Sequence, residues 1–184
     1  LPTALHFILI LLGAASGYRK REFTFSEIGS ITVVIPTRDE EILIRRKLEN
    51  VKKISASLDS FSVLIYDCSE DKTAEIATQF IEEEGFTDNW KVIENCEIGK
   101  SNSVRRAIEE VSSEVMILTD ADSIVDGDAF RDLLRTLGRA DVTAACGIDG
   151  GDMSIYRRIS NWIRVSESNI GASVVFEGSL CGFK

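Results

Sequence analysis

Two carboxylates separated by one alanine, Asp120 and Asp122, directly follow an apolar run at residues 114–119. In an extended segment such side chains point the same way, so their charges repel unless a proton or a cation lies between them. A hard divalent ion such as Mg²⁺ or Mn²⁺, which can bridge carboxylates to a diphosphate, suits this arrangement. The spacing and the strand-end position predict a metal site. A solvated acidic turn is the alternative, because short D-x-D patterns also arise by chance.

Two other polar segments follow β-branched apolar runs in the same way. One begins at Thr37 and continues through Asp39 and Glu40 towards a predicted helix, whose N-terminus can hold an anion. Acidic residues of an ordinary first helical turn give the same pattern. The other begins at Asp67, whose carboxylate can accept a hydrogen bond from a nucleobase N–H or can form a turn. Lys100 follows a glycine before a further helix and can offset a phosphate charge.

These segments are spaced along a chain that alternates between short apolar runs and stretches with helical periodicity. Such alternation predicts an α/β fold with a mainly parallel sheet flanked by helices. Ligands of these sheets bind at the carboxyl ends of the strands, where the polar segments would meet. One helix is expected after Asp71, which can cap it. The predicted strands cover residues 31–36, 61–66, 90–93, 114–119 and 142–146, and further helices cover residues 40–54, 104–111, 128–137 and 154–170.

The composition is that of one globular domain, with 184 residues, of which 44% are hydrophobic and 28% charged. A net charge of -9 argues against nucleic acid as a partner, because proteins that track phosphate backbones carry a basic face. The four cysteines are Cys68, Cys96, Cys146 and Cys181. Their wide spacing predicts reduced thiols in a cytosolic domain and no zinc site.

The N-terminal segment predicts attachment to a membrane. Residues 1–17 are apolar and uncharged, and a basic stretch from Tyr18 to Arg21 follows them. An interfacial aromatic and a basic cluster are typical of the cytoplasmic end of a transmembrane helix. Because a span needs roughly 20 residues, we predict that residues 1–17 are the C-terminal part of an anchor and residues 18–30 a juxtamembrane linker. A buried helix and a signal-peptide core are the alternatives.

The helix expected at residues 154–170 is amphipathic. Its apolar side either packs on the sheet or lies near a membrane surface or an acceptor channel.

Four segments, VVIPTRDEE, LIYDCSEDKT, GKSNSVRRA and ILTDADS, occur in the order and spacing of glycosyltransferase family 2, which the chain resembles over residues 31–184. That family contains inverting enzymes with the GT-A fold, a Rossmann-like, mainly parallel sheet. The segments IRRKLENV and ESNIGASVVFEGSLCGFK resemble its membrane-bound subgroup of poly-N-acetylglucosamine and hyaluronan synthases. The resemblance implies a GT-A domain on the cytoplasmic face of a membrane.

The resemblance also implies the reaction, which is metal-dependent transfer of a sugar from a nucleoside-diphosphate sugar, with uridine expected as the nucleoside, to a glycan acceptor. A polyprenyl-phosphate acceptor and a non-catalytic nucleotide-sugar-binding subunit are the alternatives. Each matching position takes a role from the family. Thr37, Asp39 and Glu40 would surround the uridine, Asp67 would contact the uracil, Lys100 would hold the base or diphosphate, Asp120 would lie near the ribose and diphosphate, Asp122 would bind Mg²⁺ or Mn²⁺, and Glu177 and Gly178 would line the acceptor side.

The chain departs from the family pattern at three places. Asp39 stands where the family usually has Asn, and the D-D-G-S segment is replaced by Tyr66-Asp67-Cys68-Ser69. The E-D motif that carries the catalytic base, and the Q-x-x-R-W motif of processive members, are absent from the sequence up to Lys184. The catalytic base is therefore expected beyond Lys184, and the chain is expected to be incomplete at its C-terminus.

Overall fold

The computed structural model describes residues 8, 10–15, 28–94, 100–148, 150, 154–169 and 179–184. The chain divides into two units. One unit comprises Phe25–Gly147 with Gly178–Lys184, and the other comprises Leu1–Thr24 with Ile148–Glu177. Within the described ranges, no helix combines the length and the apolar character needed to cross a bilayer.

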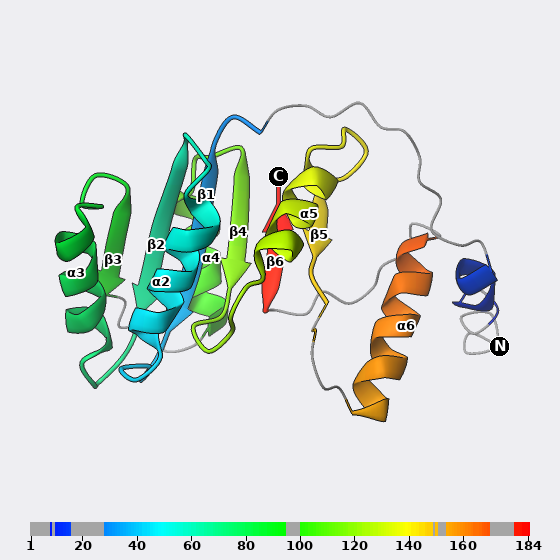
Figure 1. Ribbon diagram of the computed structural model, residues 1–184, viewed down its shortest axis with the longest axis horizontal. Coiled ribbons are helices and arrows are strands. Elements are labelled where there is room, and N and C mark those ends of the chain that lie inside the picture. Colours follow the sequence, from blue (N-terminus) through cyan, green and yellow to red (C-terminus); the bar gives the residue numbers. More distant parts are fainter. Residues whose placement is uncertain are drawn as a thin grey trace. The chain divides into compact units, whose positions relative to one another are not determined.

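The larger unit is built on a six-stranded sheet with the strand order β3-β2-β1-β4-β6-β5 (Figure 1). The first four strands are parallel, which confirms the mainly parallel sheet. The last strand, β6, is antiparallel to both of its neighbours, an orientation that the apolar pattern did not predict. The strands are β1 (Ile31–Thr37), β2 (Phe61–Asp67), β3 (Trp90–Glu94), β4 (Val115–Thr119), β5 (Ala144–Cys146) and β6 (Leu180–Phe183).

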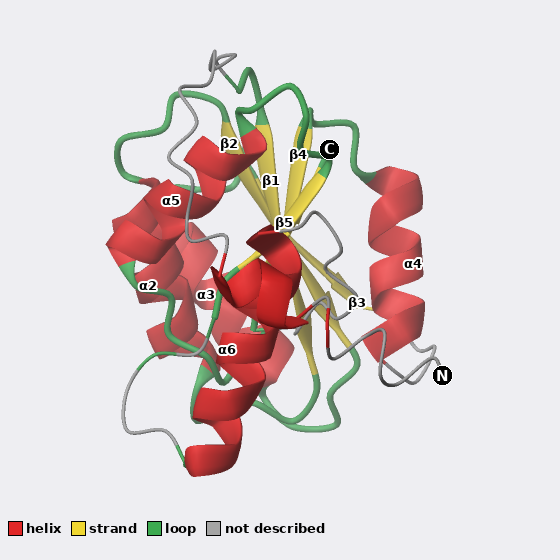
Figure 2. Cartoon of the chain, turned by 90° about the vertical axis from the view of Figure 1, so that its right-hand side faces the viewer, coloured by secondary structure: helices red, strands yellow, loops and turns green. Residues whose placement is uncertain are grey.

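Helices cover both faces of this sheet. Figure 2 shows α4 (Lys100–Glu110) on one face and α2 (Ile44–Ser55), α3 (Thr73–Glu84) and α5 (Gly127–Leu137) on the other. Alternate residues of the central strands supply the two apolar layers. Val33 and Ile35 join the core under α2, α3 and α5, whereas Val34 joins the core under α4. Burial on both faces explains why the parallel strands read as continuous apolar runs.

Two helix starts differ from the sequence prediction. The helix expected from residue 40 begins at Ile44, because residues 41–43 form a turn in which the N–H groups of Leu43 and Ile44 both donate to the Glu40 carbonyl at 2.9 Å. Asp71 lies one position before the N-cap of α3, although its carboxylate still accepts a hydrogen bond from the Thr73 N–H at 2.9 Å. The loop between β1 and α2 is therefore longer than the sequence suggested.

The smaller unit contains α6 (Ile155–Asn169) and a short helical stretch at residues 10–15. The Asn169 side chain donates to the Gly13 carbonyl at 3.1 Å, and a Cβ at Gly13 would collide with the Ser166 backbone. Several apolar side chains of α6, among them Ile155, Tyr156 and Trp162, are exposed. The predicted end of the anchor at residue 17 lies outside the described residues.

Candidate functional site

The carboxyl ends of β1, β2 and β4 border a cavity of about 260 Å³. The strand order places β1 between β2 and β4. The connections from β1 to β2 and from β2 to β3 pass through α2 and α3 on one face of the sheet, whereas the connection from β3 to β4 passes through α4 on the other face. A sheet of this kind leaves a crevice at such a switch point, where ligands bind. The lining residues are Pro36, Thr37, Arg38, Glu40, Cys68, Ser103, Asp120, Ala121 and Asp122.

Asp120 and Asp122 both line this cavity, as the sequence predicted. They do not lie in an extended segment, however, because residues 121–122 form a turn in which the Ser123 hydroxyl donates to the Asp120 carbonyl at 2.9 Å. Ala121 between them is only 5% exposed and packs into the hydrophobic core. The turn, with Ala121 anchored in the core, brings the two carboxylates to the cavity. The expected extended segment, in which alternation would point both side chains the same way, is wrong.

Glu40 adds a third carboxylate to the cavity wall. Partial burial and the neighbouring charges of Asp122, Asp71 and Asp39 raise the pKa of the Glu40 carboxyl above its ordinary value. The carboxylates that raise the pKa of Glu40 create a negative potential that a cation would relieve. The donor set consists of hard oxygen ligands, which fits Mg²⁺ or Mn²⁺. In the described part of the chain, no three Asp, Glu, His or Cys side chains converge closely enough to form a complete metal cage.

Asp67 is placed differently from these three residues. Its carboxylate is 4% exposed and accepts hydrogen bonds from the Thr37 hydroxyl at 2.6 Å and the Ser69 hydroxyl at 2.7 Å. The Ser69 N–H donates to its second oxygen at 3.2 Å. Asp67 is also not among the residues that line the cavity. Its position joins the ends of β1 and β2, and the contact with a nucleobase remains a prediction.

Asp39 also joins the two loops. Its backbone has a positive φ of 56°, a left-handed conformation that Asp and Asn tolerate better than most residues. Its N–H donates to the Ser69 hydroxyl at 2.8 Å, and its carboxylate accepts from the Glu70 N–H at 2.9 Å. The left-handed conformation gives a physical reason why either Asn or Asp can occupy this position.

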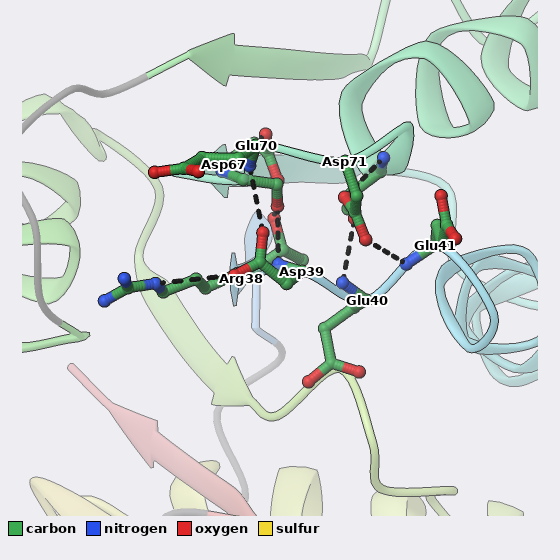
Figure 3. A network of polar contacts seen from close by, with 10 residues as sticks. Arg38, Asp39, Glu40, Glu41, Asp67, Glu70 and Asp71 are labelled. Atoms are coloured by element: carbon green, nitrogen blue, oxygen red, sulfur yellow. Dashed lines mark hydrogen bonds and ion pairs between the residues drawn. The ribbon is translucent and has the colours of Figure 1, made fainter.

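Residues 37–41 and 67–73, which we call the paired loops, are connected by several such bonds (Figure 3). The Glu40 N–H donates to the Thr73 hydroxyl at 2.8 Å, and the Glu41 N–H donates to the Asp71 carboxylate at 3.1 Å. In the figure, the side chains of Asp39 and Asp71 lie between the two loop backbones. The two loops are therefore held against each other by backbone N–H groups that donate to side chains of the opposite loop.

Residues 119–125, which we call the aspartate loop, are held from α2 by a residue that the sequence analysis did not single out. Lys47 is fully buried, and its ammonium group donates to the Thr119 hydroxyl at 2.7 Å and the Ser123 carbonyl at 2.9 Å. Burial lowers the pKa of Lys47 to about 8, and the charges of Asp120 and Asp122 oppose that shift. One signal was present in the sequence, because Lys47 falls on the apolar stripe of its helix beside Leu48.

Three predicted site residues cannot be placed. Lys100 is the first residue of α4, but its side chain lies outside what the structure describes. Glu177 and Gly178, predicted on the acceptor side, also lie outside the described residues. Their roles stay predictions.

The mainly parallel sheet and the acidic cavity at its switch point define a ligand-binding α/β domain. Residues 32–173 match the family described as Glycosyl transferase family 2. Because the match covers more than half of the chain, this protein belongs to glycosyltransferase family 2, and its fold is the GT-A fold that the sequence analysis expected.

Two curated relatives support this assignment. The chain is 26% identical over 132 residues to Protein RfbJ of Shigella flexneri, which covers 70% of this chain and 94% of that protein. It is 28% identical over 102 residues to the probable glycosyltransferase YdaM of Bacillus subtilis (strain 168), with coverage of 53% of this chain and 24% of that protein.

Solved structures of similar fold include the mannosyltransferase PcManGT from Pyrobaculum calidifontis, which was solved in complex with GDP-Man and Mn²⁺. It matches with a TM-score of 0.76 and 27% identity over 99% of this chain, and the chain spans about half (54%) of its length. TarS 1-349 of S. aureus in complex with UDP-GlcNAc matches with a TM-score of 0.53 and 21% identity over 68% of this chain and 37% of its own. The TarS match supports the fold alone.

Proposed function

We propose that this chain is the donor-binding part of an inverting glycosyltransferase that transfers a sugar from a nucleoside-diphosphate sugar to a hydroxyl acceptor. The observation that carries the proposal is the cavity at the ends of β1, β2 and β4, with Glu40, Asp120 and Asp122 in its wall. Family membership supports the reaction class, and the similar mannosyltransferase structure holds a nucleotide sugar and Mn²⁺.

Asp120 and Asp122 are the residues that would hold Mg²⁺ or Mn²⁺. Two carboxylates supply only part of the six oxygen ligands that these ions take, and diphosphate oxygens and water would complete the set. A bound ion would neutralise the negative charge that develops on the leaving diphosphate. The exposed guanidinium of Arg38, at the cavity wall, can add charge-assisted hydrogen bonds to the same phosphate oxygens.

The chemical step is a displacement at the anomeric carbon of the donor sugar. The acceptor hydroxyl attacks the anomeric carbon opposite the leaving diphosphate, the carbon–oxygen bond to the diphosphate breaks, and a carboxylate base takes the hydroxyl proton. Attack from the opposite face inverts the anomeric configuration. We assign no described residue as that base.

The nucleoside of the donor can be settled by titration. The resemblance to the family implies uridine, whereas the similar mannosyltransferase holds GDP-Man. The experiment is calorimetric titration of the chain with UDP and with GDP, each in Mn²⁺ and in EDTA. We expect one nucleotide to bind at least about 10-fold more tightly with Mn²⁺, and Asp122→Asn to abolish most of that gain. The proposal is wrong if neither nucleotide binds, or if Mn²⁺ makes no difference.

Asp88→Asn is the matched control for that titration. The change is chemically the same, but Asp88 is exposed and precedes β3, at the end of the sheet opposite to the cavity. This variant should bind both nucleotides as the unmodified chain does. A loss of binding there would mean that the Asp122 effect reflects net charge and not a metal ligand.

We further propose, from the sequence of residues 1–30, that the complete protein is attached to a membrane with this domain on its cytoplasmic face. A glycan or a lipid-linked phosphate is the acceptor expected in that setting. Fractionation of cells that express the complete protein tests the attachment, and recovery in the soluble fraction without salt or detergent would contradict it.

A further inference from the structure

Lys47 is a buried cation in a helix face that otherwise packs as hydrophobic core. Its neighbours on the same stripe, Ile44, Leu48 and Val51, are fully buried, and Lys47 itself is 0% exposed. Removing an ammonium group from water is costly unless its donors are satisfied, and an apolar side chain of similar length would avoid that cost. The position therefore calls for an explanation beyond packing.

The hydrogen bonds of Lys47 show what the ammonium group holds. All three link it to residues that flank the Asp120-Ala121-Asp122 turn, and they reach the Thr119 hydroxyl at 2.7 Å, the Ser123 carbonyl at 2.9 Å and the Ser123 hydroxyl at 3.3 Å. One side chain thus ties both ends of the turn that carries the two carboxylates.

A second residue of the same helix extends this attachment. The Asn50 amide donates to the Val125 carbonyl at 2.9 Å and accepts from the Val125 N–H at 2.8 Å. Lys47 and Asn50 are three positions apart and so lie on one side of α2. Side chains of α2 therefore bond the aspartate loop at Thr119, Ser123 and Val125, in addition to the bonds that the Thr119 and Ser123 hydroxyls donate to the Ser179 carbonyl.

The charge of Lys47 acts in the same direction as its hydrogen bonds. Asp120 and Asp122 both interact electrostatically with the ammonium group. Two carboxylates that face one cavity repel each other, and a positive charge behind them reduces the cost of holding them there. A loop held in this way has its carboxylates in place before a cation arrives.

We propose that Lys47 is a positioning residue for the donor site, which preforms the aspartate loop so that Asp120 and Asp122 can bind a divalent cation together with a nucleoside diphosphate. The inference rests on the proposed function for its ligand, but the preformed loop can be tested without any ligand.

The test compares Lys47→Met with Lys53→Met. Methionine keeps the length of the side chain and removes the charge, and Lys53 lies on the same helix but is exposed. In metal-free protein, hydrogen exchange is followed at the amides of residues 119–125. We expect exchange at least about 10-fold faster in Lys47→Met than in Lys53→Met, because opening of the loop no longer breaks the three bonds to the ammonium group.

The second readout is the gain in affinity that Mn²⁺ gives to the nucleoside diphosphate, measured as the ratio of dissociation constants in EDTA and in Mn²⁺. We expect Lys47→Met to reduce this ratio at least about 10-fold and to leave the dissociation constant in EDTA within about 2-fold. General damage to the fold would instead change binding in EDTA as well. The inference is overturned if either readout of Lys47→Met equals that of Lys53→Met.

If Lys47→Met does not fold, Thr119→Val is the second variant for the same two measurements. Valine has nearly the shape of threonine, and it removes the acceptor of the 2.7 Å bond from Lys47 together with the donor of the 2.8 Å bond to the Ser179 carbonyl. It should speed loop exchange and reduce the Mn²⁺ ratio by about 3-fold or more, and an unchanged value of either would overturn the inference. If Lys47→Met speeds loop exchange as expected but the unmodified chain shows no Mn²⁺-dependent nucleotide binding, the proposed function is contradicted, and with it the ligand named here, whereas the preformed loop is supported.

Discussion

The paired loops and the aspartate loop border the same cavity but are held by different means. The paired loops bond to each other, through Asp67 with Thr37 and through Asp39 with Glu70. The aspartate loop is bonded to α2, through Lys47 and Asn50. In the first case the carboxylates of Asp67 and Asp39 themselves form the structural bonds, whereas Glu40 bonds through its backbone N–H and its carboxylate lines the cavity. In the second, neighbouring residues form them, and Asp120 and Asp122 line the cavity.

This difference shows that an acidic residue at a strand end has two separate uses. A carboxylate that accepts several internal hydrogen bonds stabilises the fold and has little capacity left for a ligand. A carboxylate whose position is set by other residues keeps that capacity. Loss of a carboxylate that is bonded within the paired loops should therefore lower stability, whereas loss of Asp120 or Asp122 should weaken ligand binding and change stability little.

The largest expected effect is a difference in stability between Asp67→Ala and Asp122→Ala. Loss of the Asp67 carboxylate leaves the Thr37 and Ser69 donors in a buried site, and we expect the free energy of unfolding to fall by about 3 kcal/mol. Loss of Asp122 removes a charge that raises the pKa of Glu40, and we expect a change within about 0.5 kcal/mol. Urea unfolding in EDTA at neutral pH measures both. Equal losses would contradict the comparison.

The next effect is a pH dependence that belongs to the aspartate loop. The pKa of Lys47 is lowered to about 8 in the folded chain, so between that pH and its ordinary value of 10.5 the unfolded chain binds more protons. Stability contributed by this group therefore rises with pH in that window. The free energy of unfolding of the unmodified chain, minus that of Lys47→Met, should rise by about 2 kcal/mol between about pH 7 and pH 9.5.

The control for that measurement is again Lys53→Met, whose difference from the unmodified chain should stay flat over the same range. Metal must be absent, because a cation bound to Asp120 and Asp122 would change the charge that faces Lys47. A flat difference for Lys47→Met as well would mean that the buried ammonium has no depressed pKa.

The smallest effect concerns Asp39 in the paired loops. Asp39→Asn keeps both the tolerance for a positive φ and an oxygen that accepts from the Glu70 N–H, so a change below about 0.5 kcal/mol is expected. Asp39→Ala loses both features and should lower the free energy of unfolding by about 1 kcal/mol or somewhat more. Thermal or urea unfolding distinguishes them. A large loss in Asp39→Asn would show that the charge, and not the loop geometry, matters at this position.

The sequence by itself determined the class of fold and the general place of the site. Continuous apolar runs such as β1 and β2 are stable only when both faces are covered, so runs that alternate with helical stretches require a mainly parallel sheet. Polar residues directly after those runs must then lie along one edge of the sheet. Asp120, Asp122 and Glu40 do line one cavity, because this part of the prediction depends only on local order along the chain.

Only the tertiary structure decided which carboxylates line the cavity and how they are held. The bonds that engage Asp67 and Asp39 join residues about 30 positions apart, and the bond from Lys47 to Thr119 joins residues 72 positions apart. No periodicity or motif encodes such pairs, since they arise from the order in which strands and helices pack. For the same reason the antiparallel direction of β6 and the late start of α2 were not predicted. Periodicity indicates which side chains are buried. The hydrogen-bond partner of a buried polar group depends instead on how distant elements pack, which periodicity does not record.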